Sequence, residues 1–262
     1  EGGKSETAPY VMVPKITLEQ KREAQEILIL ANFVEVWLAK EGHDGLVGIN
    51  FLHKIQMTTA ASVFGAMLAG VDYIIMGAGI PRELPKLIRQ LEKLEIGSVP
   101  VDVIGGPAVS TTINPLDFVP ANTEIKRPKF LAIISVDVLG TYLARDEETR
   151  PDGFIIEHNS AGGHNAPPRG KYEFDANGEP IYGPKDIADL EKMKKIGLPF
   201  WLAGTYGHPL KVKAALEQGA AGVQVGTLFA ISNHSGFSSR TRSQLISKLK
   251  SDNLDIKTDI KA

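Results

Sequence analysis

The chain has 262 residues, of which 43% are hydrophobic, and its formal net charge at pH 7 is −2. This length is typical of one large α/β domain, and so small a net charge disfavours nucleic acid or an anionic membrane as a partner. Because the chain has no cysteine, disulfides, thiolate metal sites and cysteine nucleophiles are excluded; no apolar run is long enough to span a membrane, and we expect a globular cytoplasmic protein without a metal site.

Helical and strand-like segments alternate in the first part of the chain. Residues 17–40 have apolar side chains at helical spacing, and Thr17 with Gln20 has the arrangement of a capping box. Residues 46–52 and 73–77 are short apolar runs that predict buried strands, and residues 58–69 and 83–95 predict helices. Asn50 is unusual within a strand. It is either a buried residue held by backbone groups or a polar group directed at a ligand.

The second part continues the alternation around two insertions. Residues 99–129 contain glycines and prolines without a clear period, and residues 166–184 are polar and rich in turn formers, so each is predicted to be an irregular insertion. The second of these is placed to act as a lid. Strands are predicted at residues 130–135, 153–156, 199–203 and 222–225, and helices at residues 138–145, 186–196, 209–218 and 239–250.

Six strands that alternate with helices indicate a parallel sheet, because each helix returns the chain to the same edge. The length of the alternation favours a TIM (β/α)8 barrel over an open doubly wound sheet. A complete barrel has eight strands, so two strands are unaccounted for. We expect residues 1–262 to form a single barrel domain.

Polar and glycine-rich sequences follow three of the predicted strands. Residues 157–164 contain Gly162 and Gly163, which permit close approach of the backbone to a ligand, and then His164. Carboxyl ends of parallel strands bind ligands in this class of fold, so His164 is a candidate site residue. The alternative is an ordinary turn with a surface histidine.

The two other strand ends predict a phosphate site. Gly204 and Thr205 follow one strand, and Gly226 and Thr227 follow the next one. In barrels of this class a phosphate is frequently held by the loops after the last two strands, where backbone N–H groups favour an anion. The Thr227 hydroxyl is a further candidate donor to a phosphate oxygen.

Four motifs together resemble the FMN-dependent nitronate monooxygenase family, which shares its fold with the flavin-dependent enoyl-acyl-carrier-protein reductases. The motifs are Gly48-Ile-Asn50, Ala161-Gly-Gly-His164, Ala203-Gly204 and Gln224-Val-Gly-Thr227, in this order. The resemblance implies a barrel that holds FMN, with the phosphate on the last two loops, and it implies His164 as the active-site histidine. Because members of the family begin with two further strands, it also implies that the first two strands are lacking and that the barrel domain is incomplete at both ends. The positions implied to bind FMN are Asn50, Glu157, Gly162, Gly163, Gly204, Thr205, Gln224, Val225, Gly226 and Thr227.

Three positions depart from the family pattern. The family usually has glutamine where Glu157 stands, glutamate where Ser160 stands, and a second glycine where Thr205 stands. A carboxylate beside a flavin opposes the flavin's anionic reduced form. Glu157 is therefore expected to affect both the choice of substrate and the reduction potential of the flavin.

The resemblance implies an oxidoreductase that oxidises alkyl nitronates with molecular oxygen. The alternative within enzymes is NAD(P)H-dependent reduction of an enoyl thioester through the same FMN. Two other classes are a flavin-free phosphate-binding barrel enzyme and an inactive fragment. An aldolase of the first class requires a lysine at a strand end, and none of the predicted strand ends has one. The expected partner is a small molecule, and the sequence does not indicate an oligomeric state.

Overall fold

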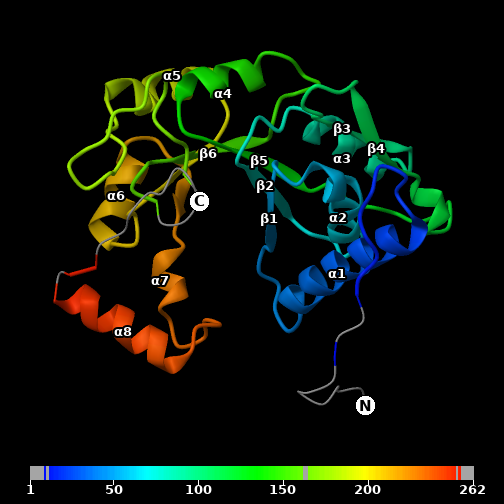
Figure 1. Ribbon diagram of the computed structural model, residues 1–262, viewed down its shortest axis with the longest axis horizontal. Helices are drawn as coiled ribbons and strands as arrows, with labels where there is room; N and C mark the ends of the chain where they lie inside the picture. The colour runs from blue at the N-terminus through cyan, green and yellow to red at the C-terminus, as the bar shows by residue number, and fades with distance from the viewer. Residues whose placement is uncertain (1–8, 10–11, 162–164, 252, 255–262) are drawn as a thin grey trace. The chain divides into compact units, whose positions relative to one another are not determined.

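The protein is represented by a computed structural model, which describes residues 9, 12–161, 165–251 and 253–254. Its main sheet has six strands in the order β1-β2-β5-β6-β7-β8 (Figure 1). The strands are β1 (Gly48–Leu52), β2 (Tyr73–Gly77), β5 (Lys129–Ile134), β6 (Gly153–Glu157), β7 (Phe200–Ala203) and β8 (Gly222–Gln224). Pairing is parallel from β2 to β8. This is a six-stranded part of a (β/α)8 barrel, so the predicted fold class is confirmed.

The strands form where β-branched and aromatic residues are concentrated, and alternate residues point to opposite faces. On one face Phe130, Phe154 and Phe200 are almost completely buried. The other face has a smaller core of Leu131, Ile155 and Ala203, with partly buried aromatic and aliphatic side chains packed against it. Glu157 is two residues beyond Ile155 in β6, so its side chain lies on this second face, at the carboxyl end of the sheet.

The chain forms two compact units. The first comprises Glu1–Ile49, Ile55–Asp72 and Lys86–Pro128, and the second comprises Asn50–Lys54, Tyr73–Pro85 and Lys129–Ala262. The cavity at the carboxyl ends of β6, β7 and β8 lies within the second unit.

In the first unit, helix α1 (Arg22–Lys40) packs against helix α2 (Gln56–Leu68). Gly65 makes the close approach possible, since a Cβ there would lie 2.2 Å from the Ile29 carbonyl oxygen. Strands β3 (Gly97–Val101) and β4 (Val109–Ile113) form an antiparallel pair, and α3 (Leu84–Glu92) lies against Gly97. The stretch 99–129, which was expected to be irregular, therefore contains regular strands.

Asp72 joins three segments of the first unit. Its carboxylate accepts hydrogen bonds from Lys40 Nζ at 2.6 Å, from the Val47 backbone N–H at 3.0 Å and from Lys126 Nζ at 3.3 Å. The hydrogen bond from Lys40 is the main cause that lowers the pKa of Asp72 to about 2, against the opposing effect of burial.

Two helix starts differ from the prediction. Helix α1 begins at Arg22 instead of Thr17, because Gln20 has a left-handed φ of 50° that a continuous helix does not allow. Helix α5 (Leu190–Ile196) begins after Asp189, whose side chain accepts hydrogen bonds from the N–H groups of residues 191 and 192. The predicted start at residue 186 falls instead in a short 3-10 turn, Pro184–Asp186.

The second unit also contains α4 (Asp137–Ala144), α6 (Pro209–Glu217), α7 (Thr227–Ala230) and α8 (Ser239–Lys250). Helix α4 packs on α5 (Figure 1), and α6 packs on β8. The segment 166–184 has defined internal contacts. The Asp175 N–H donates to the Glu179 carbonyl oxygen, and Asp186 accepts the N–H groups of Gly183 and Arg169, each at 2.8 Å.

Candidate functional site

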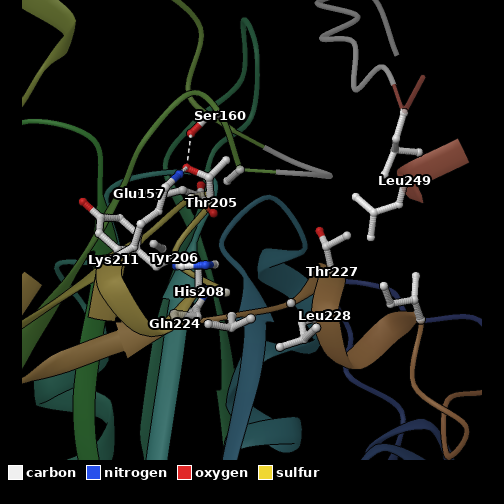
Figure 2. A pocket seen from close by; sticks show the side chains of 18 residues that line it. Glu157, Ser160, Thr205, Tyr206, His208, Lys211, Gln224, Thr227, Leu228 and Leu249 are labelled. Atoms are coloured by element: carbon white, nitrogen blue, oxygen red, sulfur yellow. Dashed lines mark hydrogen bonds between the residues drawn. The ribbon is translucent and has the colours of Figure 1, made fainter. Parts of the chain in front are cut away.

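A cavity of about 520 Å³ opens where β6, β7 and β8 end. Its lining includes the last residue of each strand, Glu157, Ala203 and Gln224, and the loops that follow them (Figure 2). Ligand cavities commonly have volumes of about 300–1,000 Å³, and the carboxyl ends of parallel strands are the usual place for them. The three strand ends selected from the sequence therefore meet at one cavity.

The loop after β7 has two consecutive residues with positive φ, Gly204 at 101° and Thr205 at 59°. Glycine suits position 204, because L side chains rarely adopt this φ and a Cβ there would lie only 3.0 Å from the Cβ of His158. Thr205 is a β-branched residue in the left-handed region, which is a strained conformation. The strained backbone turns the Thr205 hydroxyl toward Lys211 and Ser160.

Hydrogen bonds connect α6 with the ends of β7 and β6 along this wall of the cavity. Lys211 Nζ donates to Thr205 Oγ1 at 3.1 Å, and Thr205 Oγ1 lies 3.5 Å from Ser160 Oγ (Figure 2). Ser160 Oγ lies 2.9 Å from His158 Nδ1, which also accepts the Ser160 N–H at 3.2 Å. Since His158 Nδ1 accepts that N–H, the Ser160 hydroxyl donates to it and accepts from Thr205. The result is one cation and two hydroxyl groups at the cavity wall.

Glu157 provides a carboxyl group to the same cavity. Burial raises the pKa of Glu157 to about 7. The reason is that a desolvated carboxylate loses hydration that its surroundings do not replace. Near neutral pH a large fraction of Glu157 is therefore a neutral acid, which can both donate and accept a hydrogen bond.

The loop after β8 exposes its backbone to the cavity. Gly226 precedes α7, and a Cβ built on it would meet nothing within 4 Å. Gln224, Val225, Gly226 and Thr227 all line the cavity. Open space before a glycine backbone allows an anion to approach its N–H groups. The combination with Lys211 and Thr205 suits a phosphate-bearing ligand.

The far side of the cavity is apolar. It includes Leu228 of α7 and Leu249 of α8 (Figure 2). Ile231, the residue after α7, and Leu254 complete it. The cavity therefore has a polar wall at the strand ends and an apolar wall at the two following helices.

A second, much smaller cavity of about 10 Å³ adjoins Glu157. Its lining is largely polar and includes Ser135, Asn159, Arg169, Tyr182 and Asp186. This volume is close to the roughly 10–15 Å³ that one water molecule requires.

Seven of the residues predicted from the sequence line the large cavity: Glu157, Gly204, Thr205, Gln224, Val225, Gly226 and Thr227. Asn50 lies in β1 with an exposed side chain and does not belong to this lining. The buried alternative for Asn50 is therefore wrong. Gly162, Gly163 and His164 lie outside the described residues.

Lys211, His208 and Tyr206 also line the cavity and were not predicted. His208 is the N-cap of α6, where its Nδ1 accepts the Leu210 N–H at 3.2 Å. Lys211 is one turn further along α6. A lysine or histidine in the first turn of the helix that follows Gly204 and Thr205 was the available signal, because that turn starts near the strand end.

Among the described residues, no group of three or more histidine, aspartate or glutamate side chains is arranged to hold a metal ion. Within the same residues, no helix combines the length and hydropathy that crossing a bilayer requires.

The sequence model of the family described as nitronate monooxygenase matches residues 98–261, which is more than half of the chain. No curated protein matches the chain. Among solved structures, FabK from Thermotoga maritima has a TM-score of 0.52 and 18% identity over 82% of this chain and 51% of its own. A mutant of that FabK has a TM-score of 0.51 and 16% identity, over 84% of this chain and 63% of its own. Nitroalkane oxidase from Streptomyces ansochromogenes has a TM-score of 0.44 and 16% identity, over 86% of this chain and 52% of its own.

The two FabK structures show that the fold is shared. At 51% and 63% of their length, this chain spans only part of either structure.

Proposed function

Because the chain belongs to the nitronate monooxygenase family, we propose that it is an FMN-dependent oxidoreductase that oxidises alkyl nitronates with molecular oxygen. The observation that carries this proposal is the large cavity at the ends of β6, β7 and β8. Glu157, Gly204, Thr205 and Gln224 to Thr227, which the family resemblance selects as FMN contacts, all line that cavity.

The lining suits the phosphate of FMN. Lys211 supplies a positive charge, Thr205 and Ser160 supply hydroxyl groups, and Gly226 leaves its backbone open. Charged and N–H donors of this kind favour phosphate oxygens. We assign the phosphate to these residues together with Gly204 and Thr227. Asn50, Glu157, Gly162 and Gly163 are proposed as further contacts on the family resemblance.

FMN, when bound, supplies the redox chemistry that amino-acid side chains lack. The task of the chain is then to hold a nitronate anion in place, exclude water and move a proton. His164 is proposed to orient the anion or to exchange a proton with it, because imidazole has a pKa close to neutrality. This role for His164 rests on the family resemblance.

A second candidate reaction is the NAD(P)H-dependent reduction of an enoyl thioester. The apolar wall of the cavity, formed by Leu228, Ile231, Leu249 and Leu254, supports it, because an acyl chain gains free energy from apolar contacts. The same wall also accommodates the alkyl group of a nitronate, so we rank this reaction second.

Two assays on one preparation of purified protein, reconstituted with FMN, test the choice. We expect oxygen consumption that depends on an alkyl nitronate, and no NAD(P)H oxidation when an enoyl thioester is added. Turnover only with the enoyl thioester would move the chain to the reductases. Absence of turnover in both assays, with FMN bound, would contradict an active enzyme and favour an inactive fragment.

A further inference from the structure

Glu157 borders two cavities that the same strand end separates. Of the described residues, it alone belongs to the lining of both the large cavity of about 520 Å³ and the small cavity of about 10 Å³. Its position as the last residue of β6, paired with Ala203 of β7, fixes the backbone between the two spaces. A carboxyl group at this point can exchange a proton with either side.

The small cavity is built from fixed polar groups. The Tyr182 hydroxyl donates to the Ala166 carbonyl oxygen at 3.1 Å and lies 3.3 Å from Asn165 Oδ1. Asp186 holds the Arg169 and Gly183 N–H groups at 2.8 Å each. These contacts hold the tyrosine oxygen and the aspartate in place, so the lining offers the two or more polar partners that a buried water requires.

We propose that Glu157 is a proton-exchanging residue of the large cavity, and that one water molecule in the small cavity returns its proton. The Glu157 O–H bond breaks as its proton passes to an electron pair of the ligand, and the bonding pair stays on the carboxylate. The water then gives a proton to the carboxylate and takes one from solvent, past the exposed Arg169 in the lining of the small cavity. The step needs no oxidant or reductant. The identity of the ligand rests on the proposed function.

Charged and titratable groups surround Glu157 on both sides. Lys211, His208 and Tyr206 share the large cavity with it, and Arg169, Tyr182 and Asp186 share the small one. Lys211 donates a hydrogen bond to Thr205. The Asp186 carboxylate accepts hydrogen bonds from the backbone N–H groups of Arg169 and Gly183.

Burial thus dominates the titration of Glu157, and it raises the pKa to about 7. A proton-exchanging group is most effective when its pKa lies near the working pH. A buried charge with a purely structural role is usually held by a cation or by several N–H donors.

The first test uses the protein without ligand. Difference infrared spectra across neutral pH are expected to show one neutral carboxylic acid that ionises near pH 7, and Glu157→Gln is expected to remove this signal. Glu173→Gln, a change at an exposed carboxyl of the nearby loop, is the control and should leave the signal intact. The same spectrum in wild type and Glu157→Gln would overturn the proposal.

The second test uses FMN as the probe. Calorimetric titration in buffers of different ionisation enthalpy counts the protons taken up on binding. Bound FMN would further desolvate the Glu157 carboxyl and so raise its pKa. Wild type is therefore expected to take up a fraction of a proton near pH 7, and Glu157→Gln is not. Equal proton uptake in both proteins would overturn the role of Glu157. If FMN bound to neither protein, the proposed function would be contradicted, while the infrared result on the free protein would still decide the role of Glu157.

The water relay has its own variant. Ser135→Val, at another residue of the small cavity's lining, replaces a hydroxyl group with methyl groups and leaves the Glu157 side chain itself unchanged. It should leave the infrared transition in place and slow the proton uptake that follows rapid mixing with FMN by several-fold, as followed with a pH indicator. An unchanged uptake rate would rule out the relay.

Discussion

Lys211 Nζ lies 3.1 Å from Thr205 Oγ1, and both side chains line the cavity at the strand ends. The contact joins the first turn of α6 to the strained loop after β7. It therefore places the positive charge of this wall beside a hydroxyl group that is itself 3.5 Å from Ser160.

Lys211→Met should weaken FMN binding by about 10- to 100-fold, because a hydrogen bond to a charged group contributes about 1.5–3 kcal/mol. Fluorescence titration with FMN measures the change. Lys213→Met is the matched control, since Lys213 is on the same helix, is highly exposed and pairs with Glu217. Similar affinities for the two variants would remove Lys211 from the phosphate site.

Thr205→Gly should stabilise the protein and weaken FMN binding together. Glycine relieves the left-handed φ of 59° at this position, which we expect to raise stability by about 0.5–1 kcal/mol after the entropic cost of glycine. The lost hydroxyl should lower FMN affinity several-fold. Thr205→Ala also lacks the hydroxyl but keeps the strain, so it should lose affinity without gaining stability. A lower melting temperature for Thr205→Gly than for wild type would disprove the strain argument.

The sequence predicts most strands of the sheet, because continuous β-branched runs such as residues 130–134 have few other stable environments in an alternating chain. It misses β3 and β4. Their pairing lies outside the main sheet, and Pro100 with the glycines at 105 and 106 conceals their alternation. The late start of α1 depends on the left-handed backbone of Gln20, which propensity does not report.

Part of the candidate site could also be predicted from the sequence. Glycine and threonine after β7 and β8 mark the cavity directly, since strand ends meet in this fold. Lys211 was missed because its role depends on the direction in which α6 leaves the loop. The raised pKa of Glu157 follows from burial at the strand end, and the sequence alone does not give burial. Asn50 matches a family motif, yet its strand lies outside the lining of the cavity.

Gly79→Ala should destabilise the second unit. His53 Nε2 lies 3.0 Å from Glu83 Oε1, and a Cβ on Gly79 would lie 2.2 Å from His53 Nδ1. The imidazole would have to move away from Glu83, at an expected cost of about 1–3 kcal/mol, which thermal unfolding measures. Gly183→Ala is the control, because nothing lies within 4 Å of its added Cβ and its φ is −123°. Equal melting temperatures for both variants would contradict the close packing of His53.

Asp72→Asn should lower stability at neutral pH but not in strong acid. The folded pKa of about 2 is below the ordinary value of 3.8, so the carboxylate stabilises the fold above about pH 4 and loses this effect as the pH falls toward 2. We expect a difference of about 1–2 kcal/mol at pH 7 that shrinks below pH 4, measured by urea unfolding of both proteins. Asp44→Asn, at an exposed position, should show no such pH dependence. A constant difference between Asp72→Asn and wild type across this range would argue against the ion pairs.

The central claim, that the cavity at the ends of β6, β7 and β8 holds the phosphate of FMN, is tested most directly by FMN titration of three proteins. Wild type and Gly226→Asp are compared with Gly236→Asp, which adds the same charge at another glycine whose Cβ position is open. We expect wild type and Gly236→Asp to bind FMN, with quenched flavin fluorescence. Gly226→Asp should not bind it, because its carboxylate would occupy the space before the N–H groups and repel the anion. Equal binding by all three proteins, or no binding by wild type, would contradict the claim.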